Sequence, residues 1–160
     1  MRSTATWLTA AGLAAIFVLV SGAQTGGSAK HKPVMMTRLY TGPDGQTHVE
    51  EVEAKFTAGT GTNDIFKLMA ITGAELHRAP AGTVQDWHNA PRRQYVITLS
   101  GQGEVEVAGG KKIRLLPGHI DLVEDTTGKG HITKTIGNED RVTLQLPLSD
   151  QSGRSSTASR

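Results

Sequence analysis

Glycine and proline punctuate this chain so often between residues 34 and 148 that no long helix fits there. One or the other interrupts every window in which an amphipathic helix would otherwise form. Between these breaks, apolar and polar residues alternate, as in Glu104, Val105, Glu106 and Val107. Because alternation with a period of two is typical of a half-buried strand, the sequence predicts an all-β fold.

The alternating segments predict about ten short strands with turn signals between them. Paired glycines at 109 and 110 are typical of a tight hairpin between antiparallel strands. Strands of this number and spacing favour an antiparallel double-sheet jelly-roll barrel, which protects most of its sheet edges. The expected strands are residues 34–40, 48–56, 65–71, 75–79, 83–88, 94–99, 103–108, 112–116, 119–124, 131–136 and 142–146, with 65–71 the most apolar.

The N-terminus has the pattern of a secretory signal peptide at residues 1–23. A positive start is followed by an apolar stretch at residues 7–20 and by small residues that end at Ala23. Cleavage there would start the mature chain at Gln24, in the periplasm or outside the cell, with no stable membrane span left. The alternative is a retained membrane anchor, although the apolar stretch is short for a bilayer, which needs roughly 20 residues.

Composition sets the remaining limits on organisation and partners. The chain has no cysteine, which excludes disulfides, cysteine-ligated zinc and a cysteine nucleophile. Residues 24–33 are predicted to be a flexible lead-in, 34–148 the barrel and 149–160 a disordered polar tail. Since the excess basic residues lie near the chain ends and form no stripe with aromatics, we expect no nucleic-acid partner.

One stretch holds chemically versatile residues at regular spacing. Gly82 is followed by five residues and then His88, Ala90 comes two positions later, Gln94 four after Ala90, and Gly101 seven after Gln94. This spacing resembles the first motif of the cupin family, G(X)5HXH(X)3–4E(X)6G. Ala90 takes the place of the second His, and Gln94 takes the place of the Glu.

A second, looser match follows later in the chain. Gly128 and His131 resemble the G(X)2H element of the family's second motif, with Thr126 in place of its Pro and Thr135 in place of its Asn. The resemblance covers residues 75–147. It makes the chain similar to small single-domain bacterial cupin proteins with a degenerate metal motif, and by that resemblance a homodimer is expected.

The resemblance implies a metal site inside the barrel, where three His and one Glu hold a divalent transition metal such as Fe, Mn, Ni, Cu or Zn. At the matching positions this chain has His88, Gln94 and His131, with Ala90 leaving an open position for water or substrate. Loss of the carboxylate removes a negative charge, so binding of a dication should weaken.

Two acidic residues are candidates to replace the lost charge. Residues two apart on a strand share a face, so Asp86 should project beside His88 and Ala90. Asp125 precedes His131 in the second motif and is the other candidate. Arg92 and Arg93 follow a corner at Pro91, where a planar guanidinium would bind a ligand carboxylate. The alternative is a solvated loop pair or a salt bridge with Glu124 or Asp125.

These residues leave three functions open. The first is a metal-dependent enzyme acting on a small organic molecule by dioxygenation, isomerisation or lyase chemistry. The second is a non-catalytic module that binds a small molecule without metal, with its His and Gln side chains as a hydrogen-bonded cluster. The third is a structural or interaction protein of the cell envelope.

Overall fold

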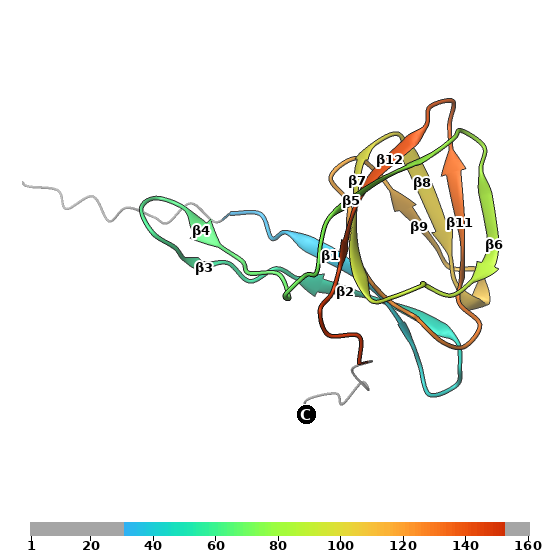
Figure 1. Cartoon of the computed structure of the whole chain (residues 1–160), viewed down its shortest axis with the longest axis horizontal. Helices are drawn as coiled ribbons and strands as arrows, with labels where there is room; N and C mark the ends of the chain where they lie inside the picture. The colour runs from blue at the N-terminus through green and yellow to red at the C-terminus, as the bar shows by residue number, and fades with distance from the viewer. Residues whose placement is uncertain (1–30, 153–160) are drawn as a thin grey trace, which may run out of the picture. The chain divides into compact units, whose positions relative to one another are not determined.

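A computed structural model describes residues 31–152, which form twelve strands and one 3-10 turn, Ala108–Gly110 (Figure 1). The predicted signal peptide, most of the lead-in and most of the tail lie outside the described residues. Within residues 31–152, no helix has the length and apolar character needed to cross a membrane.

The larger sheet has six strands in the order β2-β1-β10-β7-β12-β5. All its pairs are antiparallel except β1–β10, where Thr37 lies opposite Asp121 in a parallel register. Its strands are β1 Met35–Thr41, β2 Thr47–Glu53, β5 Glu75–Ala79, β7 Gln94–Ser100, β10 Ile120–Glu124 and β12 Arg141–Pro147.

The smaller sheet has four antiparallel strands in the order β6-β11-β8-β9 and faces the larger sheet across the barrel interior (Figure 1). A separate two-stranded sheet pairs β3 with β4. This architecture confirms the predicted all-β, double-sheet jelly roll. The strands of these two sheets are β6 Val84–His88, β8 Gln102–Glu106, β9 Lys112–Leu115, β11 His131–Ile136, β3 Thr57–Ala58 and β4 Asp64–Ile65.

Both faces of the six-stranded sheet are covered, and alternation along each strand decides which side chain goes where. Val96 and Val123 point into the barrel, where they pack in a cluster with residues of the four-stranded sheet such as Val105. Their strand neighbours Tyr95 and Leu122 point the other way and form a second cluster on the outer face.

The segment 65–71 differs from the prediction, because it forms no continuous strand and only two of its apolar residues cover the outer face of the sheet. Only Asp64–Ile65 is paired there, apart from an isolated bridge at Ile71. Phe66 and Met69 pack against the outer cluster. The other large apolar residues of the segment, Ile65, Leu68 and Ile71, are exposed, so the apolar run predicted neither a long strand nor a buried segment.

Candidate functional site

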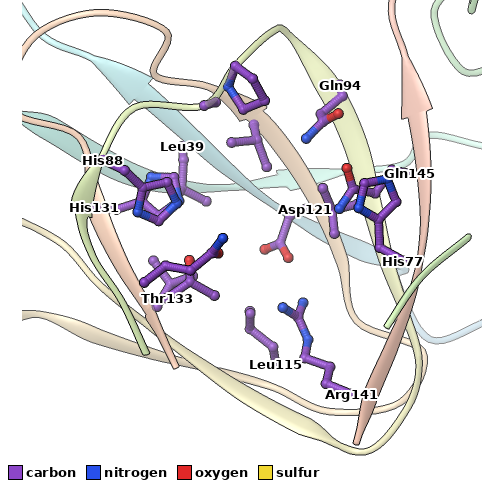
Figure 2. Close-up of a pocket in the computed structure, with 16 residues that line it drawn as sticks. Leu39, His77, His88, Gln94, Leu115, Asp121, His131, Thr133, Arg141 and Gln145 are labelled. Carbon is purple, nitrogen blue, oxygen red and sulfur yellow. The ribbon is translucent and has the colours of Figure 1, made fainter. Parts of the chain in front are cut away.

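A cavity of about 250 Å³ lies inside the barrel, between the two sheets (Figure 2). Its walls combine aliphatic side chains with histidines, amides and two charged groups. Leu39, His77, Gln85, His88, Ala90, Pro91, Gln94, Val96, Val105, Leu115, Asp121, Val123, His131, Thr133, Arg141 and Gln145 line it. An apolar pocket with a few convergent polar groups is the usual form of a small-molecule site.

Two histidines of the motif lie together on one wall of this cavity (Figure 2). His88 ends β6 and His131 begins β11, and the two residues are direct cross-strand partners. Their ring centroids are 4.5 Å apart. The two motifs, far apart in sequence, therefore converge on one pair of imidazoles.

Gly130 makes this close pairing of β6 and β11 possible. Its φ is +75°, and a Cβ added there would lie 2.0 Å from the carbonyl oxygen of His88. Any other residue would therefore push the two strands apart at the point where the histidines meet. Gly130, which lies between the motif residues Gly128 and His131, therefore has a steric role beside the site.

Each ring is held through its Nδ1 atom, and the acceptor fixes the tautomer. His131 Nδ1 donates to the Asp125 carboxylate at 2.5 Å, and His88 Nδ1 donates to the carbonyl oxygen of Asp86 at 2.7 Å. A carbonyl has no proton to give, so the Nδ1 atom must carry it. In the neutral rings, both Nε2 atoms are then unprotonated acceptors or metal ligands.

Asp125 lies behind His131 and does not line the cavity. It is 0% exposed, and its Oδ2 also accepts a hydrogen bond from the Thr47 hydroxyl at 2.9 Å. Its Oδ1 has no hydrogen-bond partner within residues 31–152. Asp125 orients the His131 ring from behind, in the manner of a carboxylate that supports a ligating histidine. It does not supply the third anion that the sequence suggested.

Gln94 lines the same cavity and is 4% exposed. Its Oε1 accepts a hydrogen bond from Arg92 Nε at 3.1 Å. Arg92 itself pairs with Glu75 through Nη2 at 2.5 Å, and it is not among the residues that line the cavity. Arg92 therefore positions Gln94, and its ion-pair partner is Glu75, not Glu124 or Asp125.

Asp86 does not share the cavity with His88, contrary to the expectation from strand alternation. His88 pairs with His131, but Gln85 pairs with Thr133, so three steps along β6 match two along β11. This bulge shifts the alternation by one residue, because one strand carries an extra residue. Gln85 therefore lines the cavity, while Asp86 is exposed. The Oδ1 atom of Asp86 accepts a hydrogen bond from the Trp87 backbone N–H.

Ala90 lies where the sequence placed it, on the cavity wall and 5% exposed. Its backbone N–H donates to the carbonyl oxygen of Asp125 at 3.2 Å, which joins the two motifs behind the histidines. A methyl group in the place of an imidazole leaves this part of the wall apolar, since Ala90 packs in the inner cluster with Leu39 and Val105.

The motif analysis missed a second polar group on the opposite sheet. Arg141 and Gln145 of β12 and Asp121 of β10 also line the cavity (Figure 2). The sequence does indicate these residues, because Arg141 and Gln145 lie on the polar face of the alternating strand β12. Alternation separates two faces of a strand but does not say which face is inside.

Asp121 is 3% exposed, and its Oδ1 accepts a hydrogen bond from His119 Nε2 at 3.0 Å. That hydrogen bond raises the pKa of His119 above its ordinary value, against the opposing effect of burial. His119 is partly buried and shares the charge of a cavity-lining carboxylate.

The donors only partly fit the metal set that the resemblance implies. His88 and His131 each present an Nε2 atom, but Gln94 supplies a neutral oxygen that already accepts from Arg92. Within residues 31–152, no three His, Cys, Asp or Glu side chains are grouped closely enough to hold an ion. The chain thus offers two imidazoles, whereas a catalytic zinc site usually has three protein ligands.

No family model matches the chain, and no curated protein is similar to it at a significant level. Several solved structures are similar in fold, three of them as follows. The cupin domain of Cnp3 from Schizosaccharomyces pombe has 16% identity and a TM-score of 0.42, covering 72% of this chain and 88% of that one. A cupin protein from Bacteroides fragilis has 22% identity and a TM-score of 0.34, covering 56% and 79%.

The third is a conserved protein of unknown function from Streptococcus pyogenes, with 14% identity and a TM-score of 0.38, covering 53% of this chain and 71% of that one. The fold assignment rests on the sheets of the chain itself. Two facing sheets enclose a cavity in which His88 and His131 come from two motifs on adjacent strands. The chain has a double-sheet jelly-roll fold that resembles the fold of cupin domains.

Proposed function

We propose that this protein binds a small organic molecule inside the barrel, with His88 and His131 as the polar centre of the site. The observation that carries the proposal is the pair of tethered imidazoles, 4.5 Å apart, on the wall of a cavity. Their Nε2 atoms accept hydrogen bonds, so the ligand presents a hydroxyl or N–H group to them. The volume of about 250 Å³ is below the roughly 300–1,000 Å³ of drug-sized pockets, which favours a small metabolite.

Thermal unfolding of the full chain with a panel of small hydroxylated metabolites tests this proposal. A ligand that binds the native state alone at 100 times its Kd adds about 2.7 kcal/mol to the free energy of unfolding. We expect stabilisation that His88→Ala and His131→Ala each remove. His48→Ala is the matched control, because His48 is exposed and pairs with Asp44 away from the cavity. Stabilisation that survives in both cavity variants contradicts the proposal.

A metal-dependent enzyme is the second candidate function. It is favoured by the Nδ1 tethers of His88 and His131, which resemble those of metal-ligating histidines. A bound divalent transition metal would act there as a Lewis acid or would activate oxygen. Because the chain supplies two imidazoles and the neutral Gln94, the small molecule would have to complete the coordination.

Metal analysis of untagged protein, followed by titration with Fe²⁺, Mn²⁺, Ni²⁺, Cu²⁺ and Zn²⁺, tests this second candidate. Gln94→Glu should tighten binding, because it restores an anionic ligand at the motif position. Gln145→Glu is the matched control, since it adds the same charge to the same cavity at another position. Equal tightening in both variants would indicate a general charge effect, and metal binding unaffected by His88→Ala would exclude this site.

We further propose that binding takes place in the periplasm or outside the cell. The support is the signal-peptide pattern at residues 1–23, which ends at Ala23. N-terminal sequencing of the exported protein should return Gln24 as the first residue. A protein that stays in the cell and begins at Met1 would contradict the proposal.

A further inference from the structure

The wall opposite the histidines carries a buried cation without a carboxylate partner. Arg141 is 7% exposed and lines the cavity. Its Nε and Nη2 atoms donate to the Thr98 hydroxyl at 3.2 and 2.9 Å. Within residues 31–152, no carboxylate oxygen lies within 4.0 Å of the guanidinium. A buried charge in this state is costly, because removal from water is not repaid by an ion pair.

The part of the guanidinium that remains available has the shape of a carboxylate receptor. Arginine has five N–H donors, and Thr98 takes one from Nε and one from Nη2. The remaining three include the parallel pair at the Nη1–Nη2 edge. This edge matches the two oxygens of a carboxylate, which arginine binds through paired, charge-assisted hydrogen bonds.

Two local features hold Arg141 in this place. The register of β12 against β7 shifts between Val142 and Thr143, and such a bulge re-aims the neighbouring side chain. On the facing sheet, a Cβ added to Gly103 would lie 3.0 Å from both Cδ and Nε of Arg141. The missing side chain of Gly103 therefore leaves the space that the arginine occupies.

Asp121 is the other charged group in the cavity and is the obvious competitor for Arg141. Its Oδ1 accepts from His119 Nε2 at 3.0 Å, so its charge is shared with a group outside the cavity lining. It lies beyond ion-pair distance from Arg141. Asp121 thus leaves the arginine open and offers an acceptor for a hydroxyl of the ligand.

We infer that Arg141 is the anion subsite of the cavity and that the ligand is a small hydroxylated carboxylic acid. Its carboxylate binds the free edge of Arg141, and its hydroxyl lies toward the acceptor atoms of the cavity. The inference rests on the proposed function, because the same cavity holds the ligand, and it adds the chemical group that the ligand must carry.

Formate and acetate are the probes for this subsite, with formamide and acetamide as neutral controls of matched shape. The Nε–Hε resonances of the arginines are followed in the ¹⁵N-labelled full chain, and the resonance lost in Arg141→Gln assigns Arg141. We expect a saturable shift at Arg141 with both acids and binding at least about tenfold weaker with the amides, because a charge-assisted pair is lost. Arg93, which already pairs with Glu124, should not respond.

Gly103→Ala is the second variant, because it keeps the charge of Arg141 and displaces the side chain. Formate should bind it several-fold more weakly, even if Arg141→Gln does not fold. Equal shifts with acid and amide, a response shared by Arg93, or no saturable shift at Arg141 would each overturn the inference.

His88→Ala separates this inference from the proposed function. Formate should still saturate Arg141 in that variant, because the imidazoles do not hold the carboxylate. If formate binds Arg141 but no metabolite gives a stabilisation that requires His88 or His131, the subsite stands and the proposed function fails. If stabilisation by metabolites requires the histidines but is equal for acids and neutral compounds, the proposed function stands and the subsite fails.

Discussion

Two buried arginines lie on the two faces of the same six-stranded sheet, and their surroundings are opposite. Arg93 is 0% exposed and pairs with the Glu124 carboxylate, and its Nη1 donates to the carbonyl oxygen of Asp150 at 2.6 Å. Arg141 is 7% exposed and has a neutral hydroxyl, that of Thr98, as its hydrogen-bond partner within residues 31–152. Within the described part of the chain, Arg93 has carboxylate partners and Arg141 has none.

The residues around each arginine show the same difference between the outer and inner faces of the sheet. On the outer face, Glu124 also accepts from Arg38 Nε at 2.5 Å, so its charge is shared between two cations beside an apolar cluster. On the inner face, a cavity separates Arg141 from the imidazoles (Figure 2). The comparison indicates that the outer face stabilises the fold, while the inner face keeps donors and acceptors available for a ligand.

The strongest test of the comparison is Arg93→Ala. We expect it to lower the free energy of unfolding by about 3–5 kcal/mol, near the lower end because Glu124 keeps Arg38 as a partner. Urea unfolding followed by circular dichroism measures the effect. Arg92→Ala is the control, since Arg92 is partly exposed and its pair with Glu75 is worth about 0–1 kcal/mol. Similar losses in both variants would refute a stabilising role specific to the outer network.

Asp125→Asn tests the support behind His131 on the inner side. An amide oxygen at the position of Oδ2 still accepts from both His131 Nδ1–H and the Thr47 hydroxyl, but it is neutral, and the NH2 group takes the buried position of Oδ1, which has no partner within residues 31–152. We expect a loss of about 1–3 kcal/mol in the free energy of unfolding. The ¹⁵N chemical shifts of the His131 ring should also change, because a neutral oxygen accepts the Nδ1–H hydrogen bond more weakly than a carboxylate does. Asp44→Asn, at the exposed pair with His48, should change neither quantity appreciably.

Much of the fold follows from the sequence, because alternation and turn residues encode strands directly. The motif spacing also brought out His88, Gln94 and His131, which line one cavity. The bulge in β6 was not predictable, because an extra residue in one strand is visible only against its partner. Because of this bulge, Gln85 lines the cavity and Asp86 does not.

Arg141 was not predicted as a site residue for a related reason. The alternation in β12 is evident in the sequence, but alternation does not say which face of a strand lies inside the barrel. The parallel pairing of β1 with β10 could not be predicted either, because no residue in one strand indicates which other strand it pairs with. Burial of a polar strand face thus depends on how the two sheets close over it.

Arg141→Met sharpens the comparison with Arg93 directly. Replacing an unpaired buried cation with an apolar side chain removes its desolvation cost, so we expect the free energy of unfolding to change by less than about 1 kcal/mol, in either direction. The measurement is the same urea unfolding as for Arg93→Ala. A loss as large as that of Arg93→Ala would mean that Arg141 is a structural residue and that the two faces do not differ in this way.

The smallest expected effect concerns Asp121, the one carboxylate that shares the cavity with Arg141. Its hydrogen bond raises the pKa of His119 above 6.5, so the protonated ring is favoured in the folded state. The resulting stabilisation is complete below pH 6.5 and is lost as the pH rises through the folded-state pKa.

The difference in unfolding free energy between the wild type and His119→Gln should therefore shrink from acidic to alkaline pH, and an NMR titration of His119 should give a raised pKa. Asp121→Asn should return that pKa toward its ordinary value, because the accepting charge is gone. A His119 pKa at or below the ordinary value would mean that the charge of Asp121 is directed to Arg141. Arg141 would then have a carboxylate partner in Asp121. It would differ from Arg93 only in the longer distance to that carboxylate.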